Sequence, residues 1–493
     1  MSRLSNQTLA GLPAEVRTPD YDRARLSAGI VHLGIGAFHR AHMAVYVDDL
    51  LVDHPDWAIV GASLRRPDTK DALAPQDGLY SIAVRDASGS SPRVIGSILE
   101  VLDANTERDR LLELMASPAI RIVSLTVTEK GYCHDPATGE LDPDHPDIVH
   151  DLANPDAPRS APGMIVAALA RSQAAGTEPF TVMSCDNLPA NGETTGRIVT
   201  RFAELRDKDL GAWVKEHVGF PSTMVDRIVP ATTDADRAAM TEMLGVEDAW
   251  PIMTEPFTQW VIEDHFPAGR PPFEEVGAQI AESVEPYELM KLRTLNGSHS
   301  TIAYLGYLAG HEHVSDAMAD PAFVAVIRGM QTGEIIPTLP DLDLDFFAYR
   351  DELLARFANP ALKHRTWQIA MDGSQKLPQR LLGTIRDRLE ADLGFAGLAL
   401  GVAAWMRYVT GIDEKGEAID VRDPLADRLR AIADEAGRDP EALFDGLVGV
   451  TEIFGTDLAG SRPFREAVVA HLQSLFENGA AATVADLAEQ FEE

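Results

Sequence analysis

The stretch Gly29-Ile-Val-His-Leu-Gly-Ile-Gly-Ala-Phe-His39 decides the fold. Residues 29–33 form a short apolar run that predicts a buried strand, and helix-like sequence follows at 41–53. Between them, Gly34 and Gly36 allow a tight turn in which backbone N–H groups can approach a pyrophosphate. His39 stands where a third glycine is usual, so the fingerprint is incomplete and a plain turn is the alternative interpretation.

The alternation of strand and helix continues through the first half of the chain. Further candidate strands are 57–63, 120–126, 180–184 and 224–229, and further helical segments are 106–115, 163–175 and 192–208. The stretch 134–158, rich in Pro, Asp and His, is expected to be a loop or an insertion. Strands that alternate with helices predict an α/β domain with a mainly parallel sheet.

Strand signals stop near residue 285. The segments beyond it are long, amphipathic or apolar, and helical in period: 287–310, 316–330, 346–357, 379–389, 398–410 and 464–476. A chain of 493 residues is too long for one core. We therefore expect a dinucleotide-binding domain over 1–285 and a mostly α-helical substrate and catalytic domain over 286–493.

The composition excludes several classes of protein. Lys and Arg total 43 against 77 Asp and Glu, and the resulting net charge of −34 repels nucleic acid. An anionic cofactor must therefore be held by local features. Two cysteines provide neither a disulfide framework nor a Cys-rich zinc site. The N-terminus lacks a signal-peptide pattern, and the apolar run 395–406 is shorter than the roughly 20 residues that span a bilayer. We expect a cytoplasmic protein without membrane contact.

The choice of cofactor depends on the residues after the second strand, Leu64-Arg-Arg-Pro-Asp68. An acid here binds the adenosine ribose hydroxyls of NAD, and Asp68 can serve. Arg65 and Arg66 can instead accept the 2′-phosphate of NADP, and a solvated turn is a third interpretation.

The stretch Glu288-Leu-Met-Lys-Leu-Arg-Thr-Leu-Asn-Gly-Ser-His299 carries the most chemistry. At about 100° per residue, Glu288, Asn296 and His299 fall on one arc of a helix with Lys291, provided that Gly297 does not break it. Oxidation of an alcohol needs a base for the hydroxyl proton, and a lysine can be that base where burial lowers its pKa. The alternative, without a catalytic role, is a polar helix face exposed to solvent.

Asparagine amides can hold a developing alkoxide. Besides Asn296, Asn187 qualifies because it follows a strand's carboxyl end, where ligands bind in open α/β sheets. His145, His150 and the run His311-Glu-His313 lack the spacing of a metal-ligand set, so we interpret them as surface residues and expect no metal. Cys185 is expected to be a buried structural thiol.

At this point several motifs resemble the long-chain mannitol dehydrogenase family, the polyol-specific long-chain dehydrogenase/reductases. The resemblance runs from about residue 8 to the C-terminus. Its motifs are Gly34-x-Gly36-x-Phe38-His39-Arg40-x-His42, Ser124-Leu-Thr-Val-Thr-Glu129-Lys-Gly-Tyr132, Met183-Ser-Cys-Asp-Asn187, Val225-Asp226-Arg227-Ile228-Val229-Pro230, Lys291-x4-Asn296-x2-His299 and Asp372-Gly-Ser-Gln-Lys376.

The resemblance implies a Rossmann-type domain followed by a helical one, and roles for particular residues. Lys291 would be the general base, with Asn187 and Asn296 as the oxyanion pair. Asp226, His299 and Lys376 would contact substrate hydroxyls, and Glu288 and Glu129 would connect the lysine to solvent. Gly34, Gly36, Phe38 and Asp68 would bind NAD, and no metal would be used. Pro67 stands where some members carry a second acid, which weakens the preference for NAD over NADP.

The resemblance leaves the substrate open. The N-terminal segment and Asp248-Ala-Trp-Pro251 are more similar to mannitol 2-dehydrogenases, whereas 367–379 is more similar to fructuronate reductases. We predict interconversion of D-mannitol and D-fructose by a monomer, with D-mannonate and D-fructuronate, or another hexitol or pentitol, as alternatives. A sugar- or nucleotide-binding regulatory protein is the non-enzymatic alternative, but a binder has no need of a base.

Overall fold

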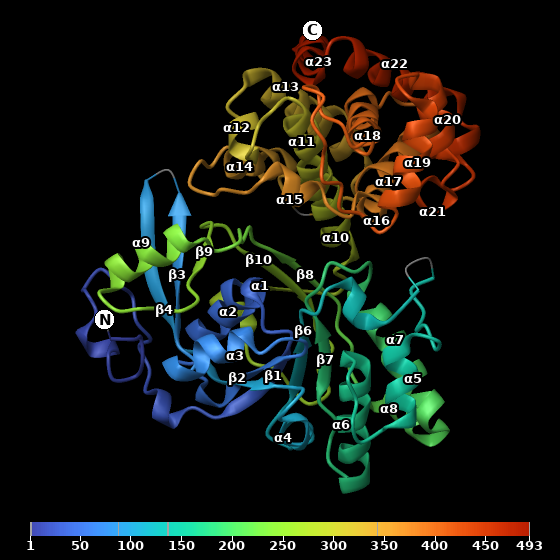
Figure 1. The fold of residues 1–493 in the computed structure, drawn as a ribbon. Coiled ribbons are helices and arrows are strands. Elements are labelled where there is room, and N and C mark those ends of the chain that lie inside the picture. The colour runs from blue at the N-terminus through green and yellow to red at the C-terminus, as the bar shows by residue number, and fades with distance from the viewer. Residues whose placement is uncertain (1, 87, 136–137, 343, 493) are drawn as a thin grey trace. The chain divides into compact units, whose positions relative to one another are not determined.

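The computed structural model describes residues 2–86, 88–135, 138–342 and 344–492. It divides into two compact units, Met1–Glu285 and Pro286–Glu493. Strands lie in the first unit, and within its described residues the second unit is built of helices (Figure 1). The prediction of an α/β domain followed by a mostly helical one is confirmed.

The first unit is organised by a five-stranded sheet in the order β5-β2-β1-β6-β7. Its strands are β1 Ala28–Leu33, β2 Ala58–Ser63, β5 Ile98–Asp103, β6 Ile122–Leu125 and β7 Thr181–Ser184. All neighbouring pairs are parallel. Counted along the chain this is the order 3-2-1-4-5 of a Rossmann sheet, with the topological switch point between β1 and β6.

Both faces of this sheet are buried, because neighbouring residues of each strand belong to different cores. Val31 and Val123 pack with helices α4 Arg108–Met115, α6 Ala161–Ala175, α7 Asn191–Arg206 and α8 Lys208–His217. Ile30 and Ile122 pack on the opposite face with α2 Met43–Leu50. This explains why the strands are continuous apolar runs rather than alternating ones.

Several predicted elements need correction. The candidate strand 224–229 is β8 Thr223–Asp226, which lies outside the parallel sheet, in a three-stranded sheet with β10 Gln259–Glu263 and β11 Gln279–Ala281. The expected helix 41–53 is two helices, α1 Ala37–Ala41 and α2, separated at His42, whose φ and ψ are −118° and −95°. The expected loop 134–158 contains α5 Pro146–Ala153. Strand β5 and a second three-stranded sheet, β4 Gly89–Ile95, β3 Tyr80–Asp86 and β9 Ile252–Thr254, were not predicted.

In the second unit, α11 Gly297–Leu308 and α18 Ala396–Tyr408 pack together in the core, and both are almost wholly buried. Around them lie α10 Glu285–Lys291, α13 Pro321–Gly329, α14 Phe346–Phe357, α15 Thr366–Ala370, α16 Gly373–Leu377, α17 Gly383–Glu390, α19 Ala426–Ala436, α20 Pro440–Val448, α22 Arg462–Glu477 and α23 Ala480–Glu492. In the described part of this unit, three segments are wound as π-helix, Leu292–Asn296, Met330–Ile335 and Pro378–Leu382. In the described part of the chain no helix has the length and apolar character to cross a membrane.

Candidate active site

In the first unit, the candidate residues follow the carboxyl ends of neighbouring strands. Gly34 comes directly after β1, Glu129 lies four residues beyond β6, and Asn187 three residues beyond β7. The Thr126 hydroxyl donates to the Gly34 carbonyl at 2.8 Å, which joins the loops at the switch point. Ligands of open parallel sheets bind at this place.

The two glycines of the first loop are required for different reasons. Gly34 has φ +87°, and a Cβ there would lie 2.2 Å from the Thr126 carbonyl oxygen, so the fold itself demands glycine. A Cβ at Gly36 would meet no atom closer than the Gly34 oxygen at 3.8 Å. Because internal packing does not require a glycine at 36, the exposed loop fits the close approach of a ligand such as a dinucleotide pyrophosphate.

His39, in place of the third glycine, lies flat on His32, with ring centroids 3.4 Å apart and an interplanar angle of 13°. The His32 nitrogens bind the Ser124 and Thr126 hydroxyls, each at 2.8 Å. Burial lowers the pKa of His32 to about 3 and that of His39 well below its usual value, so both rings are neutral. Among the described residues neither nitrogen of the buried His39 ring has a hydrogen-bond partner, as expected beside a site that a polar ligand completes.

The acid that would select NAD starts a helix after β2. Asp68 is the first residue of α3 Asp68–Leu73, and its carboxylate lies 3.3 Å from the Arg66 guanidinium. Arg66 is 81% exposed and Asp68 44% exposed, so the pair is solvated. The carboxylate expected for NAD and the guanidinium expected for NADP thus lie side by side.

Asn187 and Glu129, both exposed, are connected through Asp186. The Asp186 carboxylate accepts hydrogen bonds from the backbone N–H groups of Val127 and Thr128 at 2.9 and 3.0 Å. Burial is the main cause that raises the pKa of Asp186 to about 6, and the charge of Glu129 adds to the increase. The remaining first-unit residue, Asp226, ends β8 and is 4% exposed.

In the second unit the candidate residues surround a π-helical turn. Lys291 ends α10, Asn296 ends the π segment Leu292–Asn296, and His299 lies in the first turn of α11. A π turn holds one extra residue, so Asn296 falls back by ~100° and lies ~40° from Lys291 rather than ~140°. Each of the three side chains belongs to a residue that is 6% exposed. The turn therefore strengthens the common face that simple helical spacing predicts, and Gly297 does not break the helix.

His299 lies among positively charged and aromatic groups of its own unit. Its ring centroid is 4.6 Å from that of Phe357 and 5.3 Å from that of His364. Burial, and then the charges of His364, Arg380, Arg356 and Lys376, hold the pKa of His299 well below its usual value. The imidazole is neutral, and its buried Nε2 atom has no hydrogen-bond partner among the described residues.

Lys376 is fixed by its own helix pair. Its ammonium group donates to the Ile369 and Met371 carbonyls at 3.2 and 2.6 Å, across the bend between α15 and α16. Asp372 takes φ +55° at this bend, and Arg380, in the next π turn, donates to the Ser300 hydroxyl at 3.1 Å. Lys376, Arg380 and His299 are thus brought near one another by contacts between α11 and the segment 372–382.

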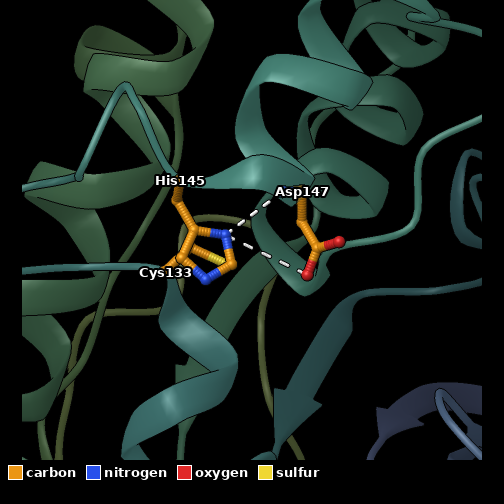
Figure 2. Close-up of side chains that lie close together, drawn as sticks. All are labelled: Cys133, His145 and Asp147. Carbon is orange, nitrogen blue, oxygen red and sulfur yellow. Dashed lines mark hydrogen bonds and ion pairs between the residues drawn. The ribbon is translucent and has the colours of Figure 1, made fainter.

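One group of three potential metal-ligating side chains occurs among the described residues, Cys133, His145 and Asp147 (Figure 2). His145 is the N-cap of α5, and its Nδ1 atom accepts the Asp147 backbone N–H at 3.2 Å. That bond uses the lone pair of Nδ1 and leaves the proton of a neutral ring on Nε2. Burial raises the pKa of Cys133 to about 12, which keeps the sulfur a thiol. Of the three residues, His145 and Asp147 thus form a helix cap.

The other histidine prediction needs partial correction. His313 was expected at the surface, but its side chain is only 13% exposed because it caps α12 Val314–Ala317 through Asp316. His150 likewise pairs with the buried Asp151 at 2.9 Å.

Comparison with known proteins assigns both units to one family. The mannitol dehydrogenase Rossmann domain matches residues 28–275, and the mannitol dehydrogenase C-terminal domain matches residues 283–476. The chain belongs to the mannitol dehydrogenase family. It is therefore an oxidoreductase of that family, as the sequence motifs predicted.

Several relatives of the mannitol dehydrogenase family match over nearly their whole length. The uncharacterized oxidoreductase YeiQ of Escherichia coli strain K12 is 49% identical, over 95% of this chain and 96% of the relative. The D-mannonate oxidoreductase of the same strain is 47% identical, over 96% and 98%. The structure of Pseudomonas fluorescens mannitol 2-dehydrogenase, a ternary complex with NAD and D-mannitol, matches with a TM-score of 0.92 and 41% identity over 99% and 100%.

Sequence reasoning missed the groups that hold the candidate residues. Asp186 was named only as part of a motif, although its place between a strand end and Asn187 was a signal. Arg356 and His364 carry no signal in the sequence, because they lie far from Lys291 along the chain and reach His299 only through packing. Of two arginines near Lys376 in sequence, Arg380 lies beside His299, whereas Arg365 is 60% exposed and pairs with Glu312 at 3.5 Å.

Proposed function

We propose that this protein is an NAD-dependent dehydrogenase that interconverts a secondary alcohol of a six-carbon polyol or sugar acid with the corresponding ketone. The observation that carries the proposal is the π turn that brings Lys291, Asn296 and His299 to one face of a buried helix. π turns inside α-helices are often found at functional sites.

In this proposal Lys291 takes the hydroxyl proton during oxidation and returns it during reduction. The amides of Asn187 and Asn296 donate to the oxygen as negative charge develops on it. Asp226, His299 and Lys376 bind the substrate, and Glu288 and Glu129 pass the proton between Lys291 and solvent. A bound nicotinamide supplies the hydride acceptor, so the proton and the hydride leave the alcohol separately and no metal is needed.

Three features support a dinucleotide at the Gly34–His39 loop with Phe38 as part of it: the space beside Gly36, the buried unpartnered His39 and the Rossmann strand order. Asp68 favours NAD, and the solved relative named above was crystallised with NAD. Arg66 beside Asp68 keeps NADP as the second choice.

Two substrate pairs are supported by different observations. D-Mannonate and D-fructuronate fit the cluster of Arg380, Arg356 and Lys376 around His299, because a carboxylate needs a local cation in a protein of net charge −34. The 47% identity with a D-mannonate oxidoreductase points the same way. D-Mannitol and D-fructose, the pair first predicted, are supported by the 41% identical mannitol 2-dehydrogenase. We place the sugar acid first.

The test is kcat/KM for D-fructuronate and D-fructose with NADH, followed by absorbance on the same preparation. We expect D-fructuronate to be preferred by more than about tenfold, which is about 1.4 kcal/mol of differential transition-state binding. A tenfold preference for D-fructose would reverse the order of the two pairs. Lack of NADH oxidation with either ketose and with a wider panel of 2-ketoses would refute the function and favour the binding-protein alternative.

A further inference from the structure

Asp186 has contacts that none of the assigned roles uses. Besides Val127 and Thr128, the Asp186 carboxylate accepts from the hydroxyl of Tyr132 at 2.8 Å. Tyr132 is 1% exposed, and its hydroxyl also lies 2.6 Å from the Ser184 hydroxyl at the end of β7. One side chain thus holds both ends of the turn 127–132, which carries Glu129, against the strand that leads to Asn187.

The backbone that Asp186 holds is strained. Thr128 has φ +63° and ψ 164°, a conformation that a β-branched residue adopts rarely and at a cost of about 1–3 kcal/mol. Cys133, at the other end of the turn, has φ +53°. Such conformations persist only where the surroundings determine them, and the bonds from Asp186 to residues 127, 128 and 132 provide that determination.

The carbonyl of Asp186 is fixed as well. Asn191 donates to it at 3.0 Å and to the Thr223 carbonyl of β8 at 2.8 Å, while the Thr223 N–H donates back to the Asn191 side chain at 2.9 Å. Asn187 therefore lies in sequence between Asp186, which is bonded to the turn 127–132, and Asn191, which is bonded to β8.

We infer that Asp186 is a positioning residue of the site: through Val127, Thr128 and Tyr132 it sets the place of Glu129 relative to Asn187. The inference rests on the proposed function, in which Asn187 binds the reacting oxygen and Glu129 carries the proton. A displacement of about 1 Å in such a site can cost roughly 10²-fold in rate.

Ionised Asp186 accepts best from the two N–H groups and the hydroxyl, because a protonated carboxyl has less acceptor capacity and a donor of its own. The titratable groups that act on it are Glu129, Tyr132 and Cys185. Its pKa of about 6 predicts that activity falls in both directions of the reaction as the pH drops through 6. A general base such as Lys291 gives a different pH dependence. Oxidation needs its neutral form and reduction its protonated form, so a change in pH moves the two activities in opposite directions.

Asp186→Asn tests the inference, with Asp151→Asn as the matched control. Asp151 also accepts from two backbone N–H groups, those of Arg159 at 2.8 Å and Ser160 at 2.9 Å, and from one hydroxyl, that of Ser160 at 2.7 Å. These bonds, however, fix the loop between α5 and α6. We expect Asp186→Asn to lower kcat by roughly 10²-fold, to abolish the fall of activity near pH 6 and to speed amide exchange in 127–132. Asp151→Asn should leave all three unchanged, even where it lowers the melting temperature.

Tyr132→Phe is a second, milder variant, for which the direction of the shift in the pH profile can be predicted. The Tyr132 hydrogen bond lowers the pKa of Asp186, so its loss should move the acid limb of the pH profile to higher pH. Three outcomes would overturn the inference: an acid limb that does not move in Tyr132→Phe, a wild-type kcat in Asp186→Asn, or a loss of kcat in Asp151→Asn as large as that in Asp186→Asn. Lys291→Ala, measured in parallel, separates the two proposals: near-normal turnover there would refute the lysine base, while amide exchange and the acid limb would still report on Asp186.

Discussion

Each unit has, within its candidate site, a glycine that the fold requires, and the two requirements differ. In the first unit, Gly34 turns the chain at a strand end, with φ +87° and a carbonyl in the place of any Cβ. In the second, Gly297 has ordinary helical angles, φ −63° and ψ −49°, yet a Cβ there would lie 2.8 Å from the Arg380 carbonyl of another π turn. Backbone geometry alone already requires the first glycine, whereas only packing between distant segments requires the second.

The same difference runs through the two candidate sites. Gly34, Glu129 and Asn187 of the first unit lie on loops just beyond parallel strands, where ligands of this sheet type bind. Lys291, Asn296 and His299 of the second unit lie on a continuous helix whose face is set by a π turn. Nucleotide binding at the Gly34–His39 loop should therefore not depend on Lys291. The variants below test that independence and the proposed roles, in decreasing order of expected effect.

The largest effect is expected for Lys291→Ala. It should lower kcat by roughly 10²-fold or more, as the loss of a general base does, and leave NADH affinity within a few-fold of wild type. Turnover by absorbance and NADH binding by fluorescence measure the two effects. A parallel loss of NADH binding would show that the two sites are not independent, and near-normal turnover would remove Lys291 from the base role.

Next comes the pair of first-loop glycines. Gly36→Val should raise the dissociation constant of NADH by about tenfold or more with little change in stability, because only the ligand needs the space beside Gly36. Gly34→Ala should instead lower the free energy of unfolding by at least about 1–3 kcal/mol, since it forces a side chain into a left-handed conformation. Titration with NADH and denaturant unfolding of both variants provide the check. A loss of stability in Gly36→Val, with a loss of NADH affinity alone in Gly34→Ala, would contradict these roles.

The comparison also explains how far sequence reasoning reaches. Five candidate strands and the change to helices near 285 follow from local hydrophobic pattern, and four of the five strands lie in the main sheet. The fifth, β8, also gives a strand signal but pairs antiparallel with β10, which only tertiary contacts decide. Strand β5 was missed because Ile98–Asp103 contains Glu100 and lies at the edge of the sheet.

In the candidate site, the Lys291–His299 face was predictable from spacing, but the π turn was not. The turn coincides with contacts that spacing cannot show: Arg293 donates to Thr338 at 2.7 Å and the Gln331 amide donates to Ser298 at 2.9 Å. The roles carried over from the family resemblance remain predictions that the variants test.

A smaller, selective effect is expected at Arg380. Arg380→Gln should lower kcat/KM for D-fructuronate by about tenfold, in line with the roughly 1.5–3 kcal/mol of a hydrogen bond to a charged group, and change D-fructose by less than about threefold. Arg365→Gln is the control, because Arg365 also lies near Lys376 in sequence, eleven residues before it rather than four after it, but is exposed at the surface. Equal losses of kcat/KM for both ketoses would mean that Arg380 supports the helix rather than binding the substrate carboxylate.

No effect at all is expected from prolonged dialysis against a strong chelator. In the proposed reaction Lys291 takes the proton and the nicotinamide the hydride, so a Lewis acid has nothing left to do. In the one group of potential ligands that the described residues bring together, Cys133, His145 and Asp147, the histidine and the aspartate form the cap of α5. Cys133→Ser should accordingly behave like wild type before and after dialysis. Activity that is lost on dialysis and returns with zinc would contradict the lysine mechanism. If zinc restored the dialysed wild type but not Cys133→Ser, the metal would be located at Cys133.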